Sequence, residues 1–223
     1  MMLTISYMVL IAGCAICAAL LFRQPEKLSD ANKTRALLVT VGAGFIAIAG
    51  VTSLIVSPDN QDSETMLRLF NNLKNFIGLP LIASILLAFS LGKAFSRATW
   101  GRWVLVLFAL FELLRRSGAG DTYAIALEVV TSIALCLSFV FGKQTLLKRD
   151  KASIRLPGIL GAIFIGSSIC LLGPHAIDPY AQSSDWHNIS LGIGLALLGL
   201  AAGRWINSNQ QLSPTSHSYK NTK

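Results

Sequence analysis

The chain has 223 residues, a mean hydropathy of +0.58 and 13% charged residues, whereas an ordinary soluble domain carries about 25% charged residues. Its formal net charge is +8, but the basic residues stand in short clusters between long apolar blocks. Membrane proteins carry their orientation signals at such positions. The pattern excludes a soluble globular domain, and we expect the lipid bilayer, not nucleic acid, as the partner of the chain.

Stretches without Lys, Arg or Asp predict the membrane helices. The expected spans are 1–22, 36–58, 75–92, 103–114, 122–142, 156–174 and 186–203. A span needs roughly 20 apolar residues, and all but the fourth stretch meet that length. The fourth covers only about 20 Å between Arg102 and Arg115 at 1.5 Å per residue. Its arginine stems must therefore reach the headgroups from both ends.

The distribution of basic residues favours counting the short stretch as a span. Seven spans with the N-terminus outside place 15 of the 19 Lys and Arg residues on the inner side and 4 on the outer side. Without the fourth span, the basic cluster at 143–155 would lie outside, against the positive-inside bias. The sequence thus predicts an all-α integral membrane protein, a seven-transmembrane-helix bundle with its N-terminus out and its C-terminus in.

This prediction also sets the domain organisation and the location. Residues 1–206 form the expected bundle, and residues 207–223 form a polar cytoplasmic tail that we expect to be disordered. We expect a multi-pass protein of a bacterial inner (plasma) membrane.

Two local patterns refine the bundle. Residues 62–75 place apolar side chains at helical spacing and predict an interfacial amphipathic helix that runs into the third span, where Pro80 should kink the helix. Small residues at every fourth position, such as Gly199 and Gly203 in the last span, predict close helix packing within the chain. A homo-oligomer face or a contact with a membrane-complex partner is the alternative.

Two carboxylates fall inside the apolar spans, where ionisable residues usually face the bundle interior or a cavity. By helix rise, Glu112 lies about 6 Å and Glu128 about 9 Å from the outer ends of the fourth and fifth spans, so the two can approach each other. Arg115 and Arg116 stand at i+3 and i+4 from Glu112 and can pair with it. Glu128 has no basic residue at i±3 or i±4, which makes it the better functional candidate.

Further polar residues stand at the outer end of the third span, namely Arg68, Asn71, Asn72, Lys74 and Asn75. We take Glu128, Glu112, Lys74, Asn75, Arg115 and Arg116 as the candidate substrate- or ion-binding set. As a functional site, this set predicts a pocket in the outer half of the bundle for a proton, an ion or an anionic solute. As a structural feature, it predicts an ion-pair network that holds spans three, four and five together.

Two histidines, His175 and His187, flank the last outer loop with Asp178 and Asp185. Two imidazoles and two carboxylates can ligate a divalent metal, but the spacing matches no metal motif, so these are weak metal candidates. Asp185 as a helix cap and Trp186 as an interfacial anchor account for part of the same segment without a metal.

Sequence motifs with a known chemistry are missing. The chain has no HExxH, no GxSxG and no Gly-rich phosphate loop. It also has no lysine in the interior of the last span for a retinal and no histidine expected deep in a span for haem. We therefore expect no cofactor and assign no catalytic residue.

Three function classes stay open. The first is small-solute or ion transport, proton-coupled, through the outer-half polar pocket. The second is a non-catalytic subunit or assembly factor of a membrane complex, and the third is a membrane-embedded enzyme acting near the outer leaflet. Glu128 and its surroundings favour transport.

Overall fold

The computed structural model describes residues 2–23, 29–93, 95–117, 120–141, 148–174 and 183–211. Every regular element in these ranges is a helix, as predicted. In chain order the elements are α1 (Met2–Leu21), α2 (Asp30–Ile55), α3 (Gln61–Asn72), the π-helix η2 (Leu73–Gly78), α4 (Leu79–Ser90), α5 (Arg97–Arg116), α6 (Gly120–Val140), α7 (Lys148–Ser167), the π-helix η3 (Ser168–Leu172) and α8 (Ser184–Gln211). The last helix thus continues beyond Ile206, where the expected bundle ends.

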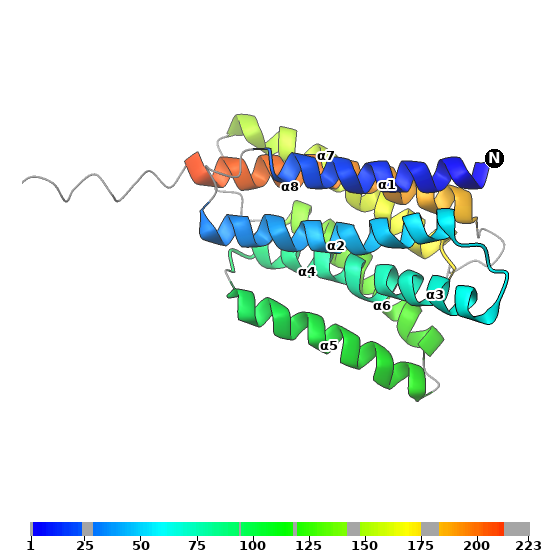
Figure 1. Cartoon of the computed structure of the whole chain (residues 1–223). Coiled ribbons are helices and arrows are strands. Elements are labelled where there is room, and N and C mark those ends of the chain that lie inside the picture. Colours follow the sequence, from blue (N-terminus) through cyan, green and yellow to red (C-terminus); the bar gives the residue numbers. More distant parts are fainter. Residues whose placement is uncertain are drawn as a thin grey trace, which may run out of the picture.

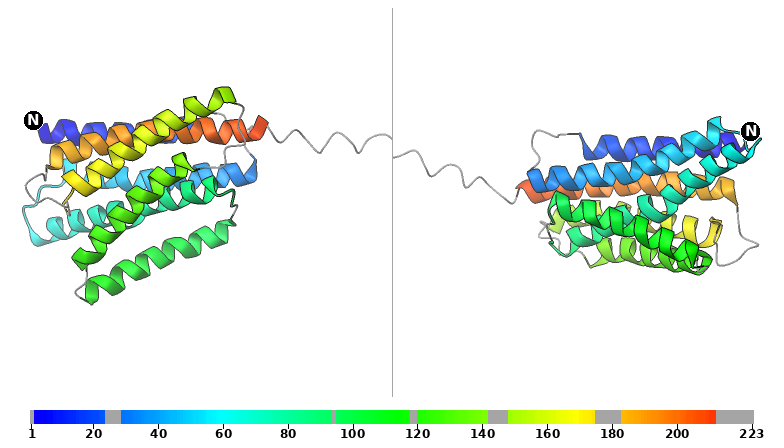
Figure 2. Two further views of the ribbon diagram at one scale, coloured as in Figure 1. Left: turned by 180° about the vertical axis from the view of Figure 1, so that it is seen from behind. Right: turned by 60° about the horizontal axis from the view of Figure 1, so that its bottom comes forward.

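The helices lie side by side in one bundle (Figure 1). Contacts run from α1 to α2, then to α4, α6, α7 and α8, and from α8 back to α1. These helices therefore form a closed ring in which each packs against two neighbours. In Figure 2, α7 crosses α8 at an angle. Helix α5 lies outside the ring, where it contacts α6 and η2.

Among the described residues, six helices are long and apolar enough to cross a membrane. They are Met2–Leu21, Asp30–Ile55, Gln61–Ser90, Thr122–Val140, Ala152–Leu172 and Ser184–Ser208. Helix α5, the expected fourth of seven spans, is absent from this set. Its apolar stretch is short because Arg102 and Glu112 interrupt a helix that begins at Arg97 and ends at Arg116. The chain is thus an all-helical, multi-pass membrane protein with six such helices in its described part.

The third span is one continuous helical run in which α3, η2 and α4 follow without a break. Helix α3 buries none of its side chains, whereas most side chains of α4 are buried. The break expected at Pro80 takes the form of the π-helix just before it, in which the N–H of Leu79 bonds to the carbonyl of Lys74. Proline has no N–H and its ring crowds the carbonyl four residues earlier, and a widened π turn accommodates both effects.

Small residues bring α8 into backbone contact with α1. A Cβ atom added at Gly199 would collide with the backbone of Cys17. One added at Gly203 would collide with the carbonyl oxygen of Leu20. The prediction that these glycines pack helices within the chain is therefore confirmed. Cys14 and Cys17 are both buried and free, on the helix that forms one side of this contact.

Candidate functional site

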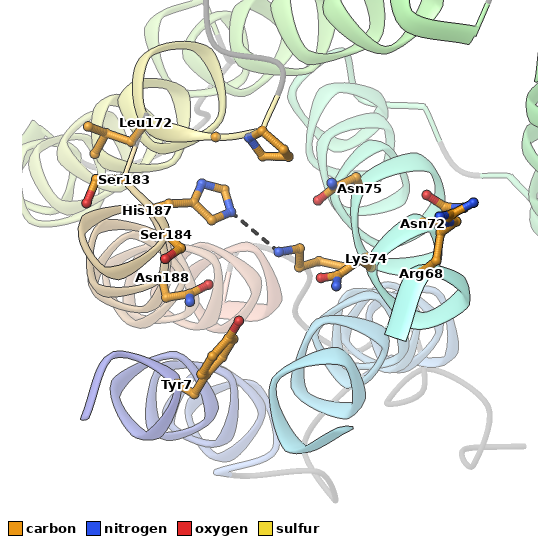
Figure 3. A pocket seen from close by; sticks show the side chains of 13 residues that line it. Tyr7, Arg68, Asn72, Lys74, Asn75, Leu172, Ser183, Ser184, His187 and Asn188 are labelled. Atoms are coloured by element: carbon orange, nitrogen blue, oxygen red, sulfur yellow. Dashed lines mark hydrogen bonds between the residues drawn. The ribbon is translucent and has the colours of Figure 1, made fainter. Parts of the chain in front are cut away.

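A cavity of about 610 Å³ lies at the end of the bundle where α1 and α8 begin (Figures 1 and 3). Tyr7 of α1 and the start of α8 form one side of it, and the junction of α3 with η2 forms the other (Figure 3). The polar residues that α3 and η2 contribute are Arg68, Asn71, Asn72, Lys74 and Asn75. Those from α8 include Ser184, His187 and Asn188.

Lys74 is the buried charge of this cavity, since only 5% of the residue is exposed. Its Nζ atom lies 3.4 Å from Nε2 of His187 on the opposite side (Figure 3). The contact joins η2 to α8. A buried ammonium is costly unless polar groups surround it, so the fold must supply partners for Lys74 at this point.

The contacts of His187 fix its tautomer. Nδ1 lies 2.9 Å from the carbonyl oxygen of Ser168 and 2.9 Å from the hydroxyl of the same residue. A carbonyl oxygen can only accept, so Nδ1 carries the ring proton in the neutral imidazole. Nε2 then has a free lone pair, and the Lys74 ammonium donates to it.

Both π-helical segments supply a residue that contacts His187. Lys74 belongs to η2 and Ser168 belongs to η3. The Ser168 hydroxyl donates to the carbonyl oxygen of His187 at 2.8 Å, which ties η3 to α8 a second time. Isolated π-helical turns occur frequently at functional sites, and here one residue of each turn contacts His187 of α8.

Ser168 and His187 do not form a nucleophile and its general base. Such a pair needs an imidazole nitrogen with a free lone pair facing the hydroxyl, whereas Nδ1 donates to the Ser168 carbonyl. Ser168 is also fully buried and does not line the cavity. The arrangement therefore orients the ring and leaves Nε2 for Lys74.

Glu128 approaches the same lysine from α6. Only 8% of the residue is exposed, and its carboxylate interacts electrostatically with Lys74. Within the described part of the chain the two groups form no direct ion pair, and Glu128 does not line the cavity. Lys74 thus contacts His187 of α8 directly and interacts with Glu128 of α6 through its charge.

The other expected carboxylate lies elsewhere. Glu112 accepts from Nε of Arg116 at 2.7 Å, on a part of α5 where both side chains are well exposed. This is the i,i+4 pair that the sequence predicts. Glu112 is not among the described residues that line the cavity with Lys74 and Asn75. The side chain of Arg115 lies outside the described residues.

The cavity lining is cationic. Arg68 and Lys74 are its charged groups, and no carboxylate belongs to the lining in the described ranges. Lys74 has three N–H groups, of which His187 accepts one. No other described residue accepts a hydrogen bond from Lys74, so its remaining donors are available to the cavity. Asn75 adds a buried amide oxygen that has no hydrogen-bond partner among the described residues.

The weak metal candidates are only partly described. His175 and Asp178 lie outside the described residues, and no group of three possible ligands occurs among those that are described. His187 faces an ammonium group, which repels a cation at Nε2. Asp185 accepts a hydrogen bond from the Ser6 hydroxyl at 3.1 Å and thereby joins α8 to α1.

All five polar residues that sequence analysis places at the outer end of the third span line this cavity. The sequence does not predict the contribution of α8, because His187 stands beside the expected last outer loop. Its position as the second residue of the expected span 186–203 is the signal that places it on a helix. No protein family, curated protein or solved structure matches the chain.

Proposed function

We propose that this protein transports a small polar solute or ion through the cavity, with coupling to protons. The observation that carries the proposal is the buried ammonium of Lys74, which faces a cavity from within a helix that can span the membrane. Ionisable groups inside spans are expensive, and they are typically kept where they serve substrate, ion or proton pathways. Lys74 also has donors that no described protein group uses.

Helix α5 completes seven spans in this account. It is 20 residues long, and its apolar side chains, such as Leu105 and Phe108, are exposed on the bundle surface as lipid-facing residues would be. Trp103 donates from Nε1 to the Ser84 hydroxyl at 3.1 Å and anchors α5 to α4. The long stems of Arg97 and Arg116 can reach the headgroups at its two ends.

The basic residues support an orientation with the cavity outside. Arg35 and Arg97 lie at the opposite end of the bundle, where they bond to the Lys93 carbonyl and the Thr34 hydroxyl. Under the positive-inside rule that end faces the cytoplasm. The N-terminus and the cavity then face outward from a plasma membrane, as expected for a bacterial inner-membrane protein, and α3 lies at the outer interface.

Proton coupling rests on Lys74 and on two titratable groups beside it, Glu128 and His187. Glu128 and His187 reach the lysine from two different helices. A proton on Glu128 removes the negative charge that competes for Lys74, which leaves the ammonium free for a solute. A proton and a solute can therefore act on one shared charge, as a coupled carrier requires.

The test is solute-dependent proton movement in proteoliposomes that enclose a pH-sensitive dye. A small panel of anionic, neutral and cationic solutes is added outside the wild-type protein, Glu128→Gln and Lys33→Gln. Lys33 is an exposed lysine on α2 and serves as the matched control. We expect at least one solute to move protons with the wild type and Lys33→Gln, and we expect loss of that signal with Glu128→Gln.

Absence of proton movement with every solute would contradict proton-coupled transport. A role as a subunit or assembly factor would then explain the same contacts as helix packing. In that case Glu128→Gln would lower the thermal stability of the bundle, because a buried ammonium would lose its counter-charge.

A further inference from the structure

We infer that the cavity selects a small anion with carboxylate- or phosphate-type oxygens, which the Lys74 ammonium binds. The inference rests on the proposed function, since it names the class of solute for the same cavity. It uses three observations, namely the charge of the lining, the unused donors of Lys74 and the helix end that faces the cavity.

The charge of the described lining favours an anionic over a cationic solute. Lys74 and Arg68 face the cavity, and the described lining contains no carboxylate. Glu128 offsets part of the lysine charge from outside the cavity, but Arg68 has no counter-ion among the described residues that line it. A cation entering here would be repelled by Lys74 and Arg68, whereas an anion would be attracted by both groups.

The geometry around Lys74 leaves room for an acceptor. One donor of the ammonium points to Nε2 of His187, and the remaining donors have no described acceptor. His187 cannot accept a second hydrogen bond from Lys74, because the single lone pair on Nε2 already accepts one. An oxygen of a carboxylate or phosphate is the strongest acceptor for a buried ammonium.

The start of α8 adds to the positive electrostatic potential in the cavity. Ser184, the first residue of this long helix, lines the cavity together with Asn188 (Figure 3). The first N–H groups of a helix have no intrahelical acceptor and favour negative charge. One side of the cavity thus includes a helix N-terminus, and the opposite side holds Lys74. The volume of about 610 Å³ suits a small organic anion or an anionic headgroup.

The experiment compares probes of equal size and different charge. The full chain, purified in a neutral detergent at low ionic strength, is titrated with acetate, acetamide, ethylammonium and inorganic phosphate, and its thermal midpoint and calorimetric heat are measured. Acetate and phosphate should bind saturably and raise the midpoint, while acetamide and ethylammonium should not. Equal effects of acetate and acetamide, or no saturable effect of either anion, would overturn the inference.

The variants locate the binding charge. Lys74→Gln should weaken anion binding by about ten- to a hundredfold, as expected for loss of a charged hydrogen bond. Lys33→Gln should leave binding within about twofold, since a distant exposed charge contributes little. If Lys74→Gln does not fold, Arg68→Gln at an exposed position should still weaken binding by up to about fivefold. Wild-type binding by Lys74→Gln, or by Arg68→Gln if Lys74→Gln does not fold, would overturn the inference.

The source of the anion is decided in nanodiscs. With phosphatidylcholine discs, free phosphate should bind as in detergent if the ligand is soluble. With phosphatidylglycerol discs, loss of phosphate binding shows that an anionic headgroup occupies the cavity, and either result supports an anion site. Anion binding without flux leaves the inference standing and defeats transport, whereas flux of neutral or cationic solutes without anion binding does the reverse.

Discussion

The Lys74 ammonium and Nε2 of His187 lie 3.4 Å apart, although 113 positions separate them in the sequence. Each residue is almost fully buried, so the contact replaces water for both. It holds the third span against the last one at the end of the bundle where the cavity lies. The same lysine also senses Glu128 on α6. One ammonium therefore connects three spans and one cavity.

Removing the acceptor should destabilise the bundle. In His187→Phe the buried Lys74 ammonium loses its only described acceptor, which we expect to cost about 2 kcal/mol or more. In the double variant Lys74→Met with His187→Phe the ammonium is gone as well, so the part of the loss that comes from its missing acceptor should return, while the loss of the bond from His187 to Ser168 stays. Thermal unfolding in detergent measures both. Equal losses from the single and the double variant would contradict the assigned contact.

Glu112 should be dispensable. Glu112 pairs with Arg116 in the last turns of α5, near the expected membrane surface, and Gln can still accept a hydrogen bond from that arginine, so Glu112→Gln should change the free energy of unfolding by less than about 1 kcal/mol. It should also leave solute-dependent proton movement intact, in contrast to Glu128→Gln. A loss of flux with Glu112→Gln at normal expression would place α5 in the pathway and contradict the account.

One methyl group added in the contact between α1 and α8 should destabilise the protein. A Cβ at Gly192 would collide with backbone atoms of Val9 and Leu10, so Gly192→Ala should cost about 1–3 kcal/mol. The control is Gly44→Ala on α2, where nothing lies near the added atom. There the helix preference for Ala predicts a neutral or slightly stabilising change. Thermal midpoints in detergent that rank the two variants the other way would refute this packing.

Helix α5 should cross the membrane. Single cysteines at Lys93 and Ser117, both exposed and on either side of α5, are placed in a background that lacks the four native cysteines. An impermeant maleimide added to intact cells should label Ser117→Cys and not Lys93→Cys, because seven spans put them on opposite sides. Labelling of both positions, or of neither, before lysis would show that α5 does not span.

The helical bundle and its six apolar spans can be predicted from the sequence, because a long apolar block in a bilayer has few possible structures other than a helix. The polar end of the third span can be predicted too, since Arg68, Lys74 and the asparagines stand where an apolar run begins. The pairing of Lys74 with His187 cannot, because it depends on how α3, η2 and α8 pack. Counting depth along separate helices suggests Glu112 and Glu128 as neighbours, but it does not predict that α5 lies outside the ring or that neither carboxylate is among the described residues lining the cavity.

The two π-helices also escape sequence reasoning. Pro80 signals a disturbance in the third span, but not that the turn before it widens and carries Lys74. The segment at Ser168 has no proline and no glycine within its π turn. Ser168 in this turn contacts His187, which lies far along the chain, so the local sequence does not predict the π-helix.

Uptake of a labelled anion tests the central claim most directly. Proteoliposomes with wild-type protein, Lys33→Gln or Lys74→Gln receive radiolabelled acetate or phosphate outside together with an inward proton gradient. The account predicts equal, gradient-dependent accumulation with the wild type and Lys33→Gln, and accumulation no higher than in protein-free vesicles with Lys74→Gln. Accumulation by Lys74→Gln at the wild-type rate would contradict the assignment of Lys74 as the charge that binds the solute.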